Sequence, residues 1–266
     1  MKKLICVILT LVMALSLTAC GGKENPSVST DGSTSMQKVI SALGEAFMED
    51  TGANFTYNAT GSGTGIKAVR DGTCDIGLSS RYLKDSEKAE GLQETILAID
   101  GIAIILYTEN PVADLTLQQI AAIFSGEITN WSEVGGKEGE IVCIGREESS
   151  GTRDGFESIT DTEDACVYRQ ELTSNGAVLT AVAENPNAIG YVSVSSVKED
   201  VKAICVGGIA PSEATIKDGS YAVQRPFVLV TKEGVALRET AQAFFDFATS
   251  PEAREIISVA GVVPVN

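Results

Sequence analysis

The sequence R-E-E-S-S-G-T-R-D-G-F, from Arg146 to Phe156, joins an arginine to the start of a predicted helix. Ser, Gly and Thr favour N-cap and first-turn positions, so Ser150, Gly151 and Thr152 predict that a helix opens there. The first N–H groups of a helix lack partners within it, and its dipole is positive at that end. These N–H groups, the hydroxyls of Ser150 and Thr152 and the guanidinium of Arg146 together predict a site for a small tetrahedral oxyanion. Taken alone, the stretch is more often a capped surface helix beside an unrelated arginine.

Two more turns rich in Gly, Ser and Thr stand between an expected strand and an expected helix. The first contains Thr34 and Ser35, and the second, T-G-S-G-T-G, contains Ser62 and follows a strand expected over 54–59. The second turn is not a dinucleotide fingerprint, because Ile66 occupies its sixth position, and no Gly-Lys-Ser/Thr follows to make a Walker loop. Both turns offer N–H groups and hydroxyls to an anion, although helix capping explains each one alone.

The expected strands and helices alternate along the chain, which predicts an α/β fold. The run ETILAIDGIAIILY, from Glu94 to Tyr107, is the most apolar one after the N-terminal segment and predicts buried strands of a parallel sheet. Asp100-Gly101 interrupts it, so one long helix is not expected. An extended segment expected over 220–231 contains Pro226, which limits it to an edge or hinge position.

The composition excludes several classes of function. The 266 residues suffice for one large or two medium domains, and the formal net charge of −16 argues against nucleic acid and anionic membrane surfaces as partners. The absence of histidine removes the commonest general base and metal ligand, and the six cysteines lack zinc spacing, so we expect no metal and no cofactor. The four cysteines that follow residue 20 are Cys74, Cys143, Cys166 and Cys205. We expect them to be free thiols, although their spacing does not decide whether any of them pair.

The N-terminus carries a processing signal. Two lysines precede an apolar segment that is too short to anchor the chain in a bilayer, and Leu17-Thr18-Ala19-Cys20-Gly21 resembles a bacterial lipobox. The pattern predicts a signal peptide over 1–19, lipidation of Cys20 and a polar tether over 20–27. A plain secretory signal with a chance cysteine is the alternative.

Asp75 stands at the entrance of a short apolar strand expected within G-T-C-D-I-G-L-S-S-R. A carboxylate among anion-binding turns is useful if the ligand carries a proton that the carboxylate accepts. Pairing of Asp75 with Arg81 or Arg146 is an equally good interpretation.

Several motifs occur in register along residues 28–266. They are G-S-T-S-M, T-G-S-G-T-G-I-K, D-I-G-L-S-S-R, I-F-S-G-E-I-T-N-W, G-R-E-E-S-S-G-T-R-D-G-F, N-A-I-G-Y-V and V-V-P-V. Together with the lipobox, they resemble the phosphate-binding lipoproteins of bacterial ABC transporters. The resemblance implies a two-lobed α/β clamshell of the periplasmic-binding-protein type 2, with a hinge and a cleft between the lobes. It places one lobe at 28–104 plus 227–266 and the other at 105–226.

The resemblance also implies the site. One lobe would supply Thr34, Ser35, Ser62 and Asp75, with Asp75 accepting the phosphate proton, and the other would supply Arg146, Ser150, Gly151 and Thr152. Some relatives have an aromatic residue in place of Ser35, and some have Asp and Gly in place of Glu148 and Ser149; Glu148 could still orient Arg146 by pairing.

The implied function is an extracytoplasmic receptor that captures inorganic phosphate and delivers it to an ABC transporter permease. The receptor would be a monomer without enzyme activity, anchored in the cell membrane through a lipid on Cys20. A carboxylate at position 75 would reject sulfate, which has no proton to donate, because an unpaired buried charge costs several kcal/mol.

Three alternatives remain open at the level of sequence. Another oxyanion, such as molybdate, sulfate or a phosphonate, is the nearest, and a surface sensor or adhesin on the same fold is the second. A serine-lysine penicillin-recognising enzyme is the third, because S-x-x-K occurs at Ser35 to Lys38 and again at Ser195 to Lys198. The companion motifs K-T-G and S-D-N are absent, which argues against this enzyme.

Overall fold

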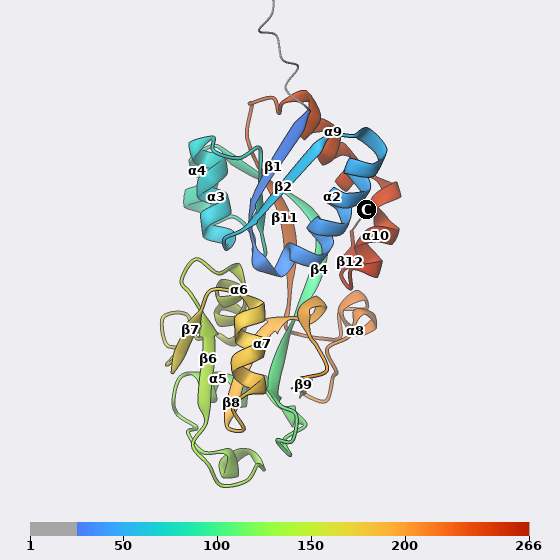
Figure 1. Cartoon of the computed structure of the whole chain (residues 1–266). Helices are drawn as coiled ribbons and strands as arrows, with labels where there is room; N and C mark the ends of the chain where they lie inside the picture. Colours follow the sequence, from blue (N-terminus) through green and yellow to red (C-terminus); the bar gives the residue numbers. More distant parts are fainter. Residues whose placement is uncertain (1–25, 266) are drawn as a thin grey trace, which may run out of the picture.

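The computed structural model describes residues 26–265. The predicted signal peptide, the lipobox and Cys20 lie outside the described residues. Within the part that is described, no helix is both long and apolar enough to cross a membrane. The chain forms two lobes, one above the other in Figure 1, and the C-terminus lies in the upper lobe beside helix α10.

Both lobes share one mixed sheet in the order β2-β1-β3-β11-β4-β8-β6-β7. In the upper lobe β1 pairs in parallel with β2 and β3, and in the lower lobe β6 pairs in parallel with β8 and β7. The bounds of these strands are β1 Ser27–Gly32, β2 Asn54–Ala59, β3 Ile76–Ser79, β4 Leu92–Tyr107, β6 Val142–Arg146, β7 Gln170–Leu172, β8 Ala188–Ser193 and β11 Gln224–Lys232. The short strands are β5 Asp114–Leu115, β9 Val201–Ala203, β10 Cys205–Val206 and β12 Val263–Pro264.

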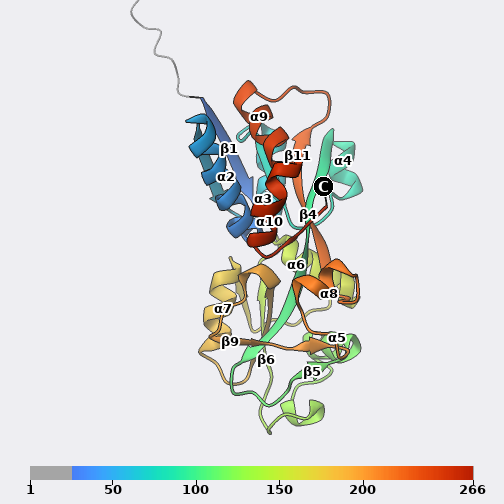
Figure 2. The ribbon, with the colours of Figure 1, turned by 90° about the vertical axis from the view of Figure 1, so that its right-hand side faces the viewer.

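Helices cover the sheet in both lobes (Figures 1 and 2). The upper lobe holds α2 Gln37–Thr51, α3 Ser62–Asp71, α4 Asp85–Ala89, α9 Glu239–Ala248 and α10 Arg254–Val259, and the lower lobe holds α5 Leu117–Phe124, α6 Gly151–Thr160, α7 Asn175–Ala183 and α8 Glu213–Lys217. Strand–helix alternation therefore gives the α/β fold that the sequence predicts.

Each lobe has its own core. In the upper lobe the apolar stripe of α2 buries Ile40, Leu43 and Phe47, and the ring of Phe47 meets that of Phe244 edge-on at 5.4 Å between centroids. Gly52 ends α2 in the left-handed conformation, with a φ of 68°. The lower lobe has a separate cluster around Phe124, Phe156 and Tyr191.

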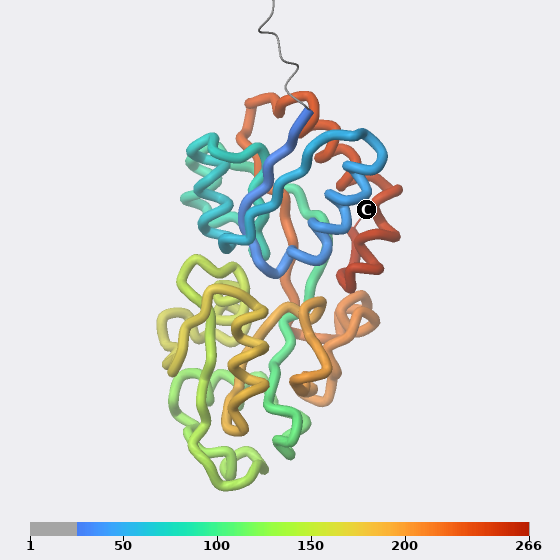
Figure 3. The backbone as a smooth tube through the Cα atoms, in the orientation of Figure 1, coloured from blue at the N-terminus to red at the C-terminus, as the bar shows by residue number. Residues whose placement is uncertain are grey.

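Strands β4 and β11 carry the chain between the lobes (Figure 3). Strand β4 pairs with β11 as far as Gly101 and with β8 from Ile102 onward, both in antiparallel fashion. The apolar run from Glu94 to Tyr107 therefore lies within a single strand, and the prediction of parallel strands is wrong there. Pro226 lies in β11 opposite Ile99, close to this crossing. Because β11 lies between β3 and β4, the edge position is wrong, and the hinge position stays a prediction.

Candidate oxyanion site

Three helix starts meet at the junction of the lobes. They belong to the 3-10 turn Thr34–Met36 that precedes α2, to α3 and to α6. The first of these follows β1 through Gly32, whose φ of 141° and close approach to the chain exclude a side chain, since a Cβ would lie 2.1 Å from the Leu78 carbonyl oxygen. The strand can therefore turn sharply into the helix start that carries Thr34 and Ser35.

Hydroxyl groups of the two lobes touch directly across the junction. The Oγ of Ser35 lies 2.8 Å from Oγ1 of Thr152, and Asn175 donates from Nδ2 to Ser35 Oγ at 2.9 Å and to Thr34 Oγ1 at 3.3 Å. All four side chains are buried. Thr34, Ser35 and Thr152 are thus brought together as the sequence predicts, while Asn175, at the start of α7, is a member that the sequence did not reveal.

A second contact brings Ser62 against the start of α6. Its Oγ accepts a hydrogen bond from Ser80 N at 3.1 Å and lies 3.2 Å from Ser80 Oγ. A Cβ on Gly151 would lie 2.4 Å from Ser62 Oγ, so only glycine allows this approach. Gly63 N also donates to the Ser149 carbonyl oxygen at 2.9 Å, which adds a backbone bond between the lobes.

Arg146 is the cation of the lower lobe and is only 1% exposed. Its Nε and Nη2 donate to the carboxylate of Glu147 at 2.9 and 3.0 Å, and Nε also donates to the Leu172 carbonyl oxygen at 3.1 Å. Among the described residues no hydrogen bond is made by Nη1, which leaves that nitrogen available to a ligand. The partner that orients Arg146 is therefore Glu147 and not Glu148, which is exposed because its side chain leaves the turn on the solvent side.

The start of α6 is fixed from both sides. Ser150 is the N-cap, and its Oγ accepts from the N–H groups of Thr152 and Arg153 at 3.2 and 3.3 Å. Its O–H remains able to donate, so capping and anion binding are compatible roles for this residue. Behind the turn, Phe156 stacks on Tyr191 with ring centroids 4.1 Å apart, and the Tyr191 hydroxyl accepts from Arg146 N at 3.2 Å.

Asp75 lies away from this cluster, and its predicted role in the site is corrected by the structure. Its carboxylate receives two hydrogen bonds from Arg238, at 2.6 and 2.8 Å, and two more from Ser29, both at 2.8 Å. Asp75 stands before β3 whereas Ser80 stands after it, a separation of about 16 Å at the usual rise of a strand. Burial raises the pKa of Asp75, but the bonds from Arg238 and Ser29 outweigh burial and leave the pKa below its usual value.

A second buried guanidinium, which sequence reasoning missed, takes part in the cluster. Arg225 of β11 is 4% exposed and donates from Nη2 to Ser35 Oγ at 2.9 Å and to Asp100 Oδ2 at 3.1 Å. Asp100 is fully buried, and burial raises its pKa to about 6 although Arg225 and Ser193 oppose that shift. The signal available in the sequence was one acidic and one basic residue, each inside a segment expected to be extended.

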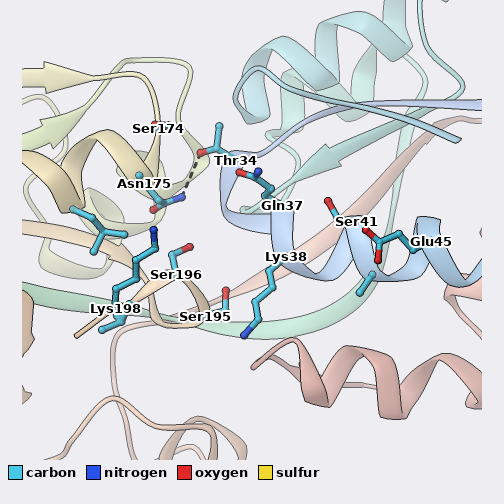
Figure 4. A pocket seen from close by; sticks show the side chains of 14 residues that line it. Thr34, Gln37, Lys38, Ser41, Glu45, Ser174, Asn175, Ser195, Ser196 and Lys198 are labelled. Atoms are coloured by element: carbon cyan, nitrogen blue, oxygen red, sulfur yellow. Dashed lines mark hydrogen bonds between the residues drawn. The ribbon is translucent and has the colours of Figure 1, made fainter. Parts of the chain in front are cut away.

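A cavity of about 680 Å³ opens beside the cluster (Figure 4). Thr34 and Asn175 form part of its wall, so it reaches the cluster from outside, and Lys38, Lys198 and Glu45 also line it. All three charged side chains are exposed to solvent. The cavity thus marks a solvent-facing side of the lobe junction, while the buried donors lie behind it.

The described residues of this cluster offer hydrogen-bond donors, and Ser35 is not paired with a lysine that could act as its base. Ser35 bonds to Thr152, Asn175 and Arg225, and no hydrogen bond joins it to Lys38. Among residues 26–265 no group of acidic or cysteine side chains could hold a metal ion. The four cysteines after residue 20 are free thiols, as expected. Hydroxyls, backbone N–H groups and two guanidiniums are the chemistry of anion binding.

Comparison with known proteins agrees with this geometry. A family model described as the PBP superfamily domain matches residues 18–252. The phosphate-binding protein PstS of Bacillus subtilis (strain 168) is 30% identical over 288 residues, which cover 99% of this chain and 94% of that protein. The chain belongs to the PstS family of phosphate-binding proteins.

Solved structures support the same membership. A protein of Clostridium perfringens, whose crystal structure is described as that of a phosphate ABC transporter substrate-binding protein with bound phosphate, is 42% identical, with a TM-score of 0.86 over 90% of this chain and 100% of that chain. An ABC-type phosphate transport receptor of Vibrio cholerae is 33% identical, with a TM-score of 0.74 over 89% of this chain and 99% of that chain. The PstS family consists of substrate receptors, so the enzyme alternative is excluded.

Proposed function

We propose that this chain captures inorganic phosphate between its lobes and delivers it to the permease of an ABC transporter. The observation that carries the proposal is the direct meeting of Ser35 and Thr152, 2.8 Å apart, at a junction of three helix starts. Each start contributes N–H groups and a positive dipole end, which suit an anion of high charge. Membership of the PstS family supports phosphate as that anion.

The proposed ligands come from both lobes. The upper lobe offers Thr34, Ser35 and Ser62, and the lower lobe offers Arg146, Ser150, Gly151 and Thr152, with the lobe bounds 28–104 plus 227–266 and 105–226 proposed as before. Ser80 takes the place that the sequence gave to Asp75, because it lies against Ser62 and would nearly touch a Cβ on Gly151.

Ligand entry requires a rearrangement at the junction of the lobes. The donors of the two lobes touch one another, so the lobes must separate or these side chains must turn before an anion enters. Strands β4 and β11 cross between the lobes and are the elements about which such a motion would occur (Figure 2).

Calorimetric titration with phosphate tests the proposal, using the chain without its first 20 residues. We expect tight binding by the unchanged chain and at least a tenfold loss in Thr152→Val, because that change removes a hydroxyl donor from a buried site. Thr180→Val is the matched control, since Thr180 lies on the exposed face of α7 and should leave affinity unchanged. Absence of phosphate binding at millimolar concentration would refute the proposed function, and binding of sulfate or molybdate in its place would identify another oxyanion.

We also propose that the mature protein is a monomer held at the outer face of the cell membrane by a lipid on Cys20. The support is the lipobox sequence L-T-A-C-G. Mass spectrometry of the protein purified from bacterial membranes should find lipidated Cys20 at the N-terminus, and Cys20→Ala should release the protein from the membrane fraction. An unmodified N-terminus elsewhere in the chain would contradict the anchor.

A further inference from the structure

One ion pair joins the two strands that cross between the lobes. Arg225 of β11 and Asp100 of β4 stand directly opposite each other in the strand register, one residue before the last pair between these strands, Gln224 and Gly101. Asp100 also accepts a hydrogen bond from Ser193 Oγ at 2.9 Å, and Ser193 belongs to β8 of the lower lobe. The pair therefore stands where both lobes and both crossing strands meet.

Burying this ion pair costs desolvation free energy. The side chains of Arg225 and Asp100 are 2% and 0% exposed, and the desolvation of such a pair often cancels its attraction. A well-packed apolar pair would serve equally well if joining the strands were the only task. The presence of two charged side chains here suggests that Arg225 has a further partner besides Asp100.

The hydrogen bonds of Arg225 indicate where such a partner would bind. Its Nη2 donates to Ser35 Oγ at 2.9 Å, and its Nη1 lies 3.4 Å from the Ser80 carbonyl oxygen. Of the five N–H groups of a guanidinium, one on Nη1 has no acceptor among the described residues. Arg225 thus stands at the upper-lobe half of the site, among the donors that the proposed phosphate would contact.

The two buried guanidiniums also act on each other. Burial lowers the pKa of Arg225, and the positive charge of Arg146 lowers it further, while Asp100 opposes both effects. An anion that contacts both cations relieves this repulsion. A dianion relieves it more than a monoanion does.

We propose that Arg225 is a second cationic ligand of the bound anion, and that Asp100 is the positioning residue that holds its guanidinium toward Ser35. The inference rests on the proposed function of phosphate capture. It gives the site two guanidiniums, each oriented by its own carboxylate: Glu147 for Arg146 and Asp100 for Arg225. Such a site favours doubly charged tetrahedral anions, and its preference comes from charge rather than from a carboxylate that accepts a ligand proton.

Phosphate titrations between pH 6 and pH 8 on four variants test the inference. We expect Arg225→Gln to weaken phosphate binding about 100-fold at pH 8, because it removes a desolvated charge-assisted hydrogen bond. Arg225→Lys should recover part of that loss, since lysine keeps the charge but lacks the planar fork. Asp100→Asn should weaken binding about tenfold by releasing the guanidinium.

The pH profile separates a ligand from a structural residue. Because Asp100 has a pKa of about 6 and ionises over the same range, the pH profile is compared between Asp100→Asn and the double variant that also carries Arg225→Gln. In Asp100→Asn affinity should rise from pH 6 to pH 8 as phosphate becomes a dianion, and in the double variant this rise should shrink. A purely structural defect would instead lower affinity by the same factor at both pH values. The double variant Asp100→Asn with Arg225→Gln removes both charges together, so it avoids an unpaired buried charge and should stay folded.

The matched control is Arg238→Gln. Arg238 also pairs with an aspartate, Asp75, but before the N-terminal end of β3, away from Ser80, so phosphate affinity should not change. If folded Arg225→Gln and the double variant bind phosphate within threefold of the unchanged chain, the inference is overturned while phosphate capture stands. If the unchanged chain binds no phosphate, the proposed function fails, and the inference fails with it.

Discussion

Two arginine–aspartate pairs look alike in sequence but differ in the burial of the arginine and in their position on the sheet. Arg225 and Asp100 are almost fully buried where the chain crosses between lobes, whereas the side chain of Arg238 is 59% exposed and its partner Asp75 stands at the far end of β3. Only the first pair reaches the donors of the other lobe, through Ser35. The comparison shows that position on the sheet, and not residue type, decides which of the two pairs contacts Ser35.

The largest expected difference between the pairs is in stability. Asp100→Ala leaves Arg225 buried without its partner, and loss of one member of a buried pair costs about 3–5 kcal/mol. Urea unfolding at pH 7 measures this loss in the free energy of unfolding. Asp75→Ala, the matched change in the pair whose arginine is exposed, should cost about 1–2 kcal/mol, because solvent screens Arg238 but Ser29 loses its acceptor. Equal losses in the two variants would mean that burial does not distinguish the pairs.

The two aspartates should also give opposite pH dependences. Burial raises the pKa of Asp100 to about 6, above an unfolded value of about 4, so the folded state binds its proton more tightly. Its contribution to stability is full below about pH 4 and is lost as pH rises to about 6, by on the order of 3 kcal/mol. The pKa of Asp75 is lowered, so its contribution is present above about pH 4 and is lost on further acidification.

Unfolding free energies measured from pH 3 to pH 7 test this sign difference. The stability of the unchanged chain relative to Asp100→Asn should fall between pH 4 and pH 6. Relative to Asp75→Asn it should rise with pH from pH 3 and then level off. A slope of the same sign for both variants would contradict the assignment of Asp100 as the buried carboxyl with the raised pKa.

The smallest expected effect is that of Asp75 on ligand choice. Because Arg238 and Ser29 already occupy its carboxylate, Asp75→Asn should leave phosphate affinity within about twofold and should not admit sulfate. Parallel titrations with phosphate and sulfate measure both quantities. New sulfate binding in this variant would restore Asp75 to the site as the acceptor of the ligand's proton.

Much of the site could be predicted because its members lie at helix starts. Ser150, Gly151 and Thr152 begin α6, and the turn with Thr34 and Ser35 precedes α2, so turn chemistry alone located the N–H groups and hydroxyls. Whether the predicted residues all bind the anion stays a prediction that titration must decide.

Other residues of the cluster escaped the sequence because no local rule marks them. Ser80 and Asn175 look like ordinary polar residues in the chain, and Arg225 looks like a surface charge beside a proline. Each one gains its place from strand order: β11 lies between β3 and β4, which brings Arg225 near Ser80 and opposite Asp100.

The sequence by itself determined the alternation of strands and helices, the turns that open toward an anion, and the absence of histidine chemistry, since all of these follow from local composition and spacing. The tertiary structure alone decided which charges meet. Asp75 and Ser80 are five positions apart, yet they lie at opposite ends of strand β3. Thr152 and Arg225 are far from Ser35 in the chain, yet each lies within hydrogen-bonding distance of it. The physical reason is that an extended strand separates close neighbours in sequence, whereas pairing between strands joins distant ones.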